Sequence, residues 1–128
     1  YDASTPGIST FQAALKQYIP GYLGSTQFET ASILAWNAPA LFAAAVKAGG
    51  LTPSSTAAQV KTGLYKLHNE TLGGTAPPLN FTPGKPAFIP CWFSTRITGG
   101  KFVSLNGNKP ICLTAAQGKA LAAALTKH

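Results

Sequence analysis

The longest apolar stretch of the chain covers residues 25–50 and predicts a long helix. Glu29 is the only charged residue within residues 28–46, and apolar side chains occur nearly all round the helical wheel. Lys47 and the glycines that follow it are typical of a helix C-terminus. We therefore expect a core helix that is covered by protein on both faces.

Two features of this stretch leave alternatives open. Pro39 has no backbone N–H, so it either kinks one long helix or marks the first turn of a shorter one. A bilayer span needs about 20 predominantly apolar residues, so a membrane helix is the alternative to a core helix. Because Glu29, Asn37 and Pro39 interrupt the window and alanine is only weakly hydrophobic, we favour the core helix.

A shorter helix is predicted near the N-terminus. Ser9 is followed three positions later by glutamine, which is the capping-box pattern of a helix start. Residues 6–7 (Pro-Gly) are expected to form a turn before it. Phe11, Leu15 and Tyr18 share the buried side of this predicted helix.

The tetrapeptide TAAQ repeats the capping-box pattern at residues 56–59 and 114–117. The first copy predicts a helix with an apolar face of Val60, Leu64 and Leu67. The second copy predicts a final, alanine-rich helix. We interpret both copies as local helix starts, because no larger internal repeat accompanies them.

Strand patterns occur mainly after the third predicted helix. Residues 79–81 predict a short strand within a segment rich in proline and glycine. Residues 88–97 combine aromatic and β-branched side chains, and Pro90 restricts that strand to a start or an edge. A glycine-rich turn then leads into a second strand at residues 101–105, which predicts a β-hairpin.

Composition narrows the class of protein. The 128 residues suffice for one ordinary domain, and 45% are hydrophobic whereas 10% are charged, which excludes a disordered chain. The net charge of +7 suits an anionic partner, but the basic residues are spread singly along the chain, so we expect no nucleic-acid binding. A start at Tyr1 and the lack of methionine suggest a processed or excised piece.

The chain offers little catalytic chemistry. Its acidic residues Asp2, Glu29 and Glu70 lie far apart, and no nucleophile elbow, phosphate-binding loop or dinucleotide motif occurs. We therefore predict that it is not an enzyme. The histidines are not at ligand spacing with the cysteines, so we expect no metal site and no cofactor.

Cys91 and Cys112 flank the predicted hairpin. They form either a disulfide or two buried free thiols, and in a secreted protein the disulfide is favoured. A bridge would close a loop whose entropy contributes about 3 kcal/mol to stability.

Loose motifs follow one another over about residues 8–105. In chain order they are FQAALKQYIP at 11–20, AWNA at 35–38, Leu41-Phe42, Ala48-Gly49, Val60 and Leu64, Gly73-Gly74, Phe81, Pro83-Gly84-Lys85 and Gly100-Lys101-Phe102. This order resembles the C-terminal part of branched-chain-amino-acid-type substrate-binding proteins of ABC transporters, the periplasmic binding protein type I group. The chain departs from the family at Trp36-Asn37, where Tyr-Asp is usual, and at Thr82-Pro83, where an acidic turn residue is common.

The resemblance implies an α/β fold and a portion of a two-lobed molecule. Residues 1–25 would belong to a helical segment of the second lobe, and residues 26–87 would supply helices and a loop to the first lobe. Residues 88–128 would hold the hinge return, the hairpin and the C-terminal helix of the second lobe. The chain would then hold parts of both lobes, and the long apolar helix would need cover from outside it.

The resemblance also implies a function. The whole protein would be extracytoplasmic, would close its lobes around an amino acid or related small molecule, and would dock on an ABC permease. Ligand-binding residues carried over from relatives are Thr30, Ala31, Ser32 and Trp36. Trp36 would pack an apolar group and Ser32 would hold a polar group, whereas core packing and helix capping are their alternative roles.

The partners expected on this basis are the remainder of the binding protein, a small-molecule ligand and the permease. A second hypothesis has a different class of function: a self-standing secreted interaction or structural domain stapled by Cys91 and Cys112.

Overall fold

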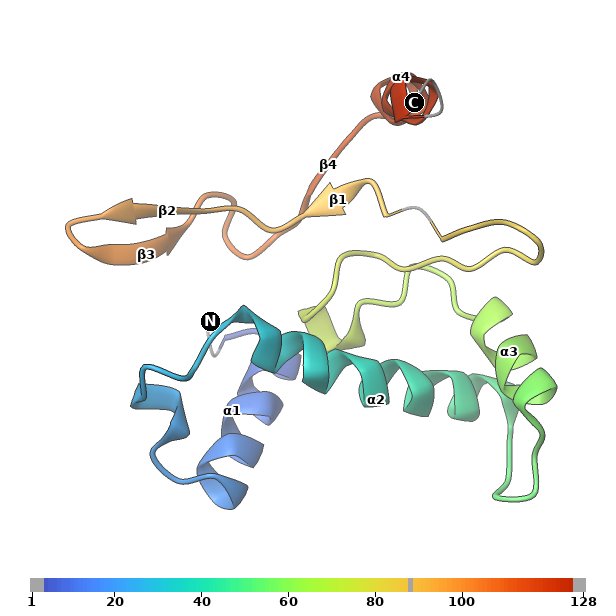
Figure 1. Cartoon of the computed structure of the whole chain (residues 1–128), viewed down its shortest axis with the longest axis horizontal. Helices are drawn as coiled ribbons and strands as arrows, with labels where there is room; N and C mark the ends of the chain where they lie inside the picture. The colour runs from blue at the N-terminus through green and yellow to red at the C-terminus, as the bar shows by residue number, and fades with distance from the viewer. Residues whose placement is uncertain (1–3, 88, 126–128) are drawn as a thin grey trace. The chain divides into compact units, whose positions relative to one another are not determined.

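The computed structural model describes residues 4–87 and 89–125, and the chain divides into two compact units. Unit 1 is Tyr1–Ala87, whose described elements are helices, and unit 2 is Phe88–His128, whose described part holds short strands and a helix (Figure 1). The fold is thus a mixture of helices and sheet. In this respect alone it agrees with the expected α/β class. All strand pairs among the described residues are antiparallel, so they form no parallel sheet.

Helix α1 spans Pro6–Tyr18, so the predicted turn at its start is wrong. The predicted capping box at Ser9 is also wrong, because the helix begins at Pro6 with Thr5 as its N-cap. Proline fits the first helical position, where its preset φ suits the helix and its missing N–H would lack a partner anyway. Phe11 is buried as predicted, whereas Tyr18 is 75% exposed, contrary to prediction.

Helix α2 spans Thr30–Gly49 and continues through Pro39, so the shorter-helix alternative is wrong. Gly50 ends it in the left-handed conformation (φ 63°) and donates a hydrogen bond from its N–H to the carbonyl of Lys47. The predicted cover on both faces is absent from the described residues: Leu34 is 63% and Phe42 57% exposed. The described elements that contact α2 most are α3 and η2, and most of the apolar window of α2 is not buried. By length and by its mean hydropathy of 1.3, α2 meets the requirements of a membrane span.

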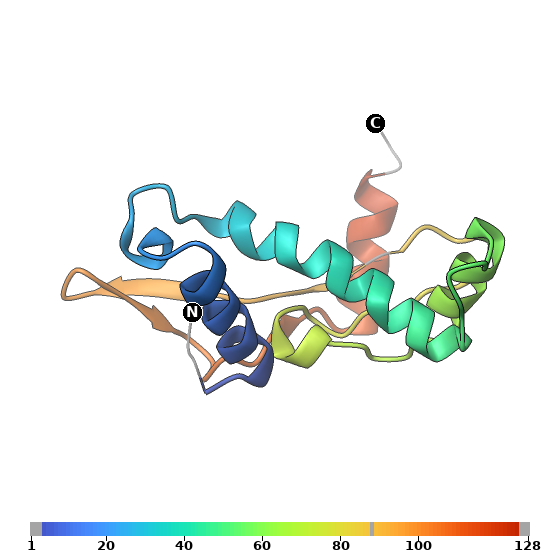
Figure 2. The same ribbon diagram turned by 90° about the horizontal axis from the view of Figure 1, so that it is seen from below.

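Helix α3, Ala57–Tyr65, packs closely against α2 (Figure 2). The predicted capping box at its start is confirmed: the N–H of Gln59 donates to Thr56 Oγ1 (3.4 Å), and the N–H of Thr56 donates to Gln59 Oε1 (2.7 Å). Gly63 lies against the backbone of Ala45, where a Cβ would overlap the Ala45 carbonyl. Glycine therefore permits the close approach of the two helices.

A tight segment, the 3₁₀ helix η2 at Leu72–Gly74, packs against α1. Gly7 permits this contact, because a Cβ there would lie 2.6 Å from the carbonyl oxygen of Leu72. After η2, the short strand predicted at residues 79–81 is only an isolated bridge between Glu70 and Leu79. This segment closes unit 1.

Unit 2 contains two small antiparallel sheets in its described part. Strand β1 (Cys91–Trp92) pairs with β4 (Ile111–Cys112), and β2 (Thr95–Thr98) pairs with β3 (Lys101–Ser104). The predicted hairpin is confirmed, but the strand expected at residues 88–97 is split into β1 and β2, which belong to different sheets.

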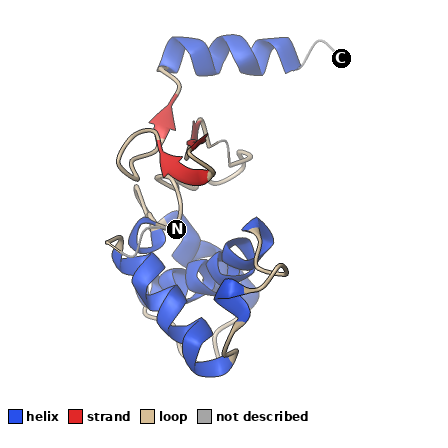
Figure 3. Ribbon diagram, turned by 90° about the vertical axis from the view of Figure 1, so that its left-hand side faces the viewer, coloured by secondary structure: helices blue, strands red, loops and turns tan. Residues whose placement is uncertain are grey.

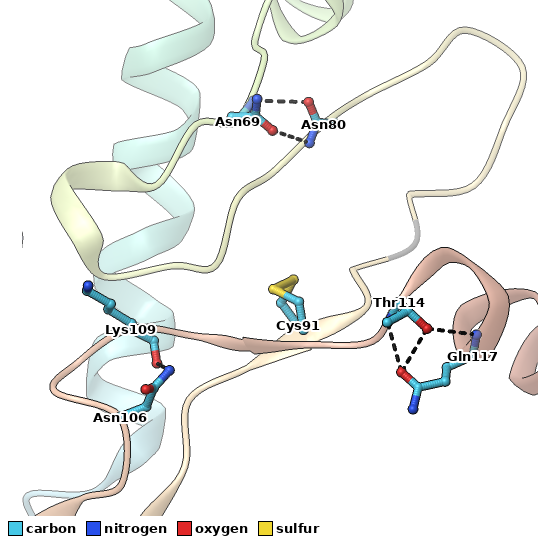
Figure 4. The surroundings of a disulfide bond; sticks show 8 residues. Asn69, Asn80, Cys91, Asn106, Lys109, Thr114 and Gln117 are labelled. Atoms are coloured by element: carbon cyan, nitrogen blue, oxygen red, sulfur yellow. Dashed lines mark hydrogen bonds between the residues drawn. A yellow bond between two sulfur atoms is a disulfide. The ribbon is translucent and has the colours of Figure 1, made fainter.

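Helix α4, Ala115–Leu125, follows the second TAAQ copy as predicted. Thr114 and Gln117 form the reciprocal hydrogen bonds of a capping box (Figure 4). Among the side chains of unit 2 whose burial is described, none that is hydrophobic is buried. In its described part, this unit therefore has a covalent link but no hydrophobic core.

That link is the disulfide Cys91–Cys112, which the structure confirms (Figure 4). The two cysteines are directly opposed in the β1–β4 pair, with their Cα atoms 4.0 Å apart. The free-thiol alternative is thereby excluded. The unit boundary at residue 87 lies where a segment boundary is predicted, and residues on both sides of position 25 pack within unit 1. The assignment of these segments to lobes stays a prediction.

Candidate functional site

The predicted ligand residues belong to unit 1 and lie on α2, one of the helices that Figure 3 colours blue. A hollow of about 330 Å³ opens there between α1, the 3₁₀ helix η1 (Tyr22–Gly24) and α2. Its lining residues, all from one contiguous part of the chain, are Phe11, Leu15, Ile19, Tyr22, Ser32, Ala35, Trp36 and Pro39. Small-molecule sites have volumes from about 300 Å³ upward, so the hollow is at the small end of that range.

Helical periodicity explains why these residues meet. Phe11 and Leu15 are four positions apart on α1 and therefore lie on one face. On α2, the spacing of Ser32, Ala35, Trp36 and Pro39 is the i, i+3, i+4, i+7 pattern of a single helix face. The hollow is thus lined by one face of α1 and one face of α2.

Three of the residues that line the hollow are aromatic, namely Phe11, Tyr22 and Trp36. The ring centroids of Phe11 and Trp36 are 5.6 Å apart, and those of Phe11 and Phe28 are 6.3 Å apart. The ring of Tyr22 meets Phe28 edge-on at 5.8 Å. Phe11 is only 1% exposed, so it belongs to the core of unit 1 as well as to the hollow. These contacts hold the lining rings in place.

The polar part of the wall is a pair of hydroxyl groups. The oxygens of Tyr22 and Ser32 are 2.8 Å apart, and the Tyr22 hydroxyl donates to the carbonyl of Gln27 (3.1 Å). Because tyrosine has one hydroxyl proton, Ser32 donates to Tyr22 in this arrangement. The lone pairs of Ser32 Oγ then remain as acceptors for a donor on a ligand.

No side chain that lines the hollow is charged at neutral pH. The hollow can therefore take an apolar group with one hydrogen-bond donor, but it supplies no counter-ion for an ammonium or a carboxylate. The charged ends of an amino acid would need other partners. An apolar moiety is the part of a ligand that this site can hold.

The structure divides the predicted ligand residues into two pairs. Ser32 and Trp36 line the hollow, whereas Thr30 and Ala31 are exposed and do not. The capping role of Ser32 is wrong, because Glu29 is the N-cap and the Ser32 hydroxyl bonds to Tyr22. Trp36 packs against the core and also lines the hollow, so its two alternative roles are compatible.

The contribution of α1 and η1 to this site is missing from the sequence prediction. Phe11 and Leu15 are predicted to be buried, which is a signal for packing but not for a site. Ile19 and Tyr22 follow the end of α1, where no helical pattern indicates their direction. Only the tertiary packing brings these residues opposite α2.

Other chemistry is sparse. Within residues 4–87 and 89–125, no three histidine, cysteine or acidic side chains gather in a way that could hold a metal ion. Glu70 accepts a hydrogen bond from the N–H of Leu72 (2.7 Å), which gives its carboxylate a structural role at η2.

The comparisons with known proteins add no relative. No protein family, no curated protein and no solved structure matches the chain.

Proposed function

We propose that the chain is part of an extracytoplasmic solute-binding protein of an ABC transporter. In this proposal the hollow beside Trp36 holds the apolar part of a small molecule, an amino acid or a related amide. The observation that carries the proposal is that Ser32 and Trp36, two residues singled out by the motif resemblance, line the same hollow together with other aromatic residues.

The exposed apolar faces support the proposal that the chain is one portion of a larger protein. Only 11% of the apolar window of α2 is buried, and Leu34 and Phe42 are exposed on it. Apolar helix faces of this length are normally covered by a sheet or by other helices. The remainder of the binding protein is the expected cover, and lobe closure would complete the ligand site before the protein docks on its permease.

The disulfide supports the location. Disulfides persist in oxidising compartments, which include the periplasm and the cell surface. The bond between Cys91 and Cys112 is therefore compatible with an extracytoplasmic protein.

Ligand titration with the emission of Trp36 tests the proposal. The variant Trp92→Phe leaves Trp36 as the only tryptophan, so its emission reports on the hollow directly. The titrants are leucine, isoleucine, valine, phenylalanine and their amides. We expect at least one to change the emission and to raise the unfolding temperature, since ligand at 100 times its Kd stabilises a protein by about 2.7 kcal/mol.

Two serine variants give a matched comparison. Ser32→Ala removes the acceptor in the hollow, whereas Ser9→Ala removes an exposed serine on the outer side of α1. We expect weaker binding of hydrogen-bond donors with Ser32→Ala only. If no titrant changes either signal, or if both variants behave alike, the small-molecule proposal fails.

A second candidate function rests on the disulfide and on the core of unit 1: a self-standing secreted interaction domain. Ile8, Phe11 and Ile33 form a small core without help from another chain. A purified chain that is monomeric and unfolds cooperatively would favour this candidate. Co-purification with a polypeptide that supplies the other half of two lobes would favour the first.

A further inference from the structure

Unit 2 has an unusual distribution of charge. The three acidic residues of the chain, Asp2, Glu29 and Glu70, all belong to unit 1. Residues 88–128 contain no acidic side chain but contain Arg96, Lys101, Lys109, Lys119 and Lys127. The surface of this unit therefore attracts anions without internal competition from carboxylates.

The β2–β3 hairpin of this unit exposes large apolar side chains. Ile97 and Phe102 are directly paired across the two strands, and they are 68% and 80% exposed. They lie beside the turn at residues 99–100, which forms the tip of the hairpin (Figure 1). No described side chain covers this pair, so it is available to a partner.

The opposite face of the same hairpin carries cations. Successive residues of a strand point to opposite faces, so Arg96 and Lys101 lie on the face away from Ile97 and Phe102. Both cations are exposed. The hairpin therefore combines an apolar pair with two cations within a few residues of its tip.

We propose that this hairpin binds an anionic membrane surface, with its tip among the lipid headgroups. Ile97 and Phe102 would reach the boundary of the acyl chains, which interfacial segments enter by about 5–10 Å. Arg96 and Lys101 have long stems, so their charged ends can stay at the level of the phosphates while the strands enter. A bilayer offers the apolar and the anionic part together and requires no cleft to receive a protruding tip.

This inference goes beyond the proposed function, since it concerns attachment and not ligand. It would keep an extracytoplasmic protein at the surface in which a permease is embedded. Membrane attachment by the hairpin does not need the ligand site, because the hairpin is in unit 2 and the hollow is in unit 1. Failure of ligand binding and failure of membrane binding are therefore separate results.

Co-sedimentation of the full chain, with its disulfide intact, tests the proposal. The probes are vesicles of phosphatidylcholine and vesicles that also contain phosphatidylglycerol. We expect binding to the anionic vesicles only, and we expect added salt to weaken it. Each basic residue near an anionic surface contributes about fivefold in affinity.

Matched variants separate the hairpin from net charge. Arg96→Gln with Lys101→Gln should lower the affinity by about fivefold for each residue. Lys61→Gln with Lys66→Gln makes the same charge change at two exposed lysines of unit 1 and should have a much smaller effect. Ile97→Ser with Phe102→Ser alters only exposed side chains, so we expect the disulfide to form normally while vesicle binding is lost.

Three results would overturn the proposal. The first is no binding of the unaltered chain to anionic vesicles. The second is an equal loss with the hairpin and the unit 1 lysine variants, which would indicate attraction by net charge alone. The third is unchanged vesicle binding by the Ile97→Ser and Phe102→Ser variant, with its disulfide verified by mass. The unaltered chain could instead bind no vesicles but self-associate in a concentration-dependent way that this variant abolishes. That result would assign the hairpin to contact with a second copy of the chain.

Discussion

Asn37 and Thr75 are 38 positions apart in the sequence and are joined by two hydrogen bonds. The amide nitrogen of Asn37 donates to the carbonyl of Thr75 (3.1 Å), and the hydroxyl of Thr75 donates to Asn37 Oδ1 (2.7 Å). The same hydroxyl lies 2.9 Å from the carbonyl of Leu72. This contact ties the middle of α2 to the segment after η2, at a buried position.

Asn37→Ala should therefore destabilise unit 1. The variant removes both hydrogen bonds and leaves the buried carbonyl of Thr75 without this partner, which costs about 1–3 kcal/mol. Unfolding in urea, followed by the emission of Trp36 in a Trp92→Phe background, measures the change. Gln17→Ala is the control, because Gln17 is exposed on α1. Equal stability of the two variants would contradict the role of Asn37.

Gly63→Ala should loosen the packing of α3 on α2. A Cβ at Gly63 would overlap the carbonyl of Ala45, and Ala45 is fully buried, so the helices must move apart. We expect a loss of about 1–3 kcal/mol in the free energy of unfolding, as for other overpacked sites. Gly24→Ala is the matched substitution, because a Cβ at Gly24 would meet no atom within 4 Å. The measurement is the unfolding temperature of each variant. A Gly63→Ala variant as stable as Gly24→Ala would contradict the close approach of α3 to α2.

Thr56→Ala should weaken the start of α3. The substitution removes the hydroxyl that accepts from the N–H of Gln59, and loss of an N-cap costs about 1 kcal/mol. Thr56→Ser keeps the hydroxyl and should retain most of the stability. Comparison of the three unfolding temperatures checks this, and it would fail if the serine and alanine variants were equally destabilised.

Loss of the disulfide should affect unit 2 selectively. The bridge joins positions separated by 21 residues, so its removal should cost about 3 kcal/mol by loop entropy. Because no hydrophobic side chain of described burial is buried in unit 2, we expect the β1–β4 pair to open when Cys91 and Cys112 are both replaced by serine.

Single-tryptophan variants can locate this effect. Trp92 lies beside the bridge, so its emission in a Trp36→Phe background should change after the serine replacements. Trp36 emission in a Trp92→Phe background should stay the same, because Trp36 belongs to unit 1. A change in Trp36 of the same size would show that the units unfold together.

Local patterns predicted much of the fold because the interactions behind them are local. The capping boxes at Thr56 and Thr114 and the β2–β3 hairpin depend on neighbouring residues, and all are confirmed. The capping-box pattern at Ser9 and the proline at position 6 are competing local signals for the start of α1, and the helix begins at the proline. The sequence alone does not show which of two such helix-start signals is the stronger.

Longer-range features required the tertiary structure. The apolar pattern of α2 predicts burial, but a pattern cannot show how much of the helix other elements cover. The division of residues 88–97 into β1 and β2 depends on partners further along the chain. Tyr22 meets Ser32 because the chain turns back between η1 and α2, within ten positions, and the spacing of the two residues does not indicate this turn.

The sequence by itself determined the long helix, the two confirmed capping boxes, the hairpin and the pair of cysteines. Each of these features depends on residue type or on residues that are close together in the sequence. Only the tertiary structure decided that Ser32 and Trp36 share a hollow while Thr30 and Ala31 do not. The physical reason is that a hollow is bounded by faces of separate elements, and the packing of those elements selects which residues of a predicted helix turn toward it.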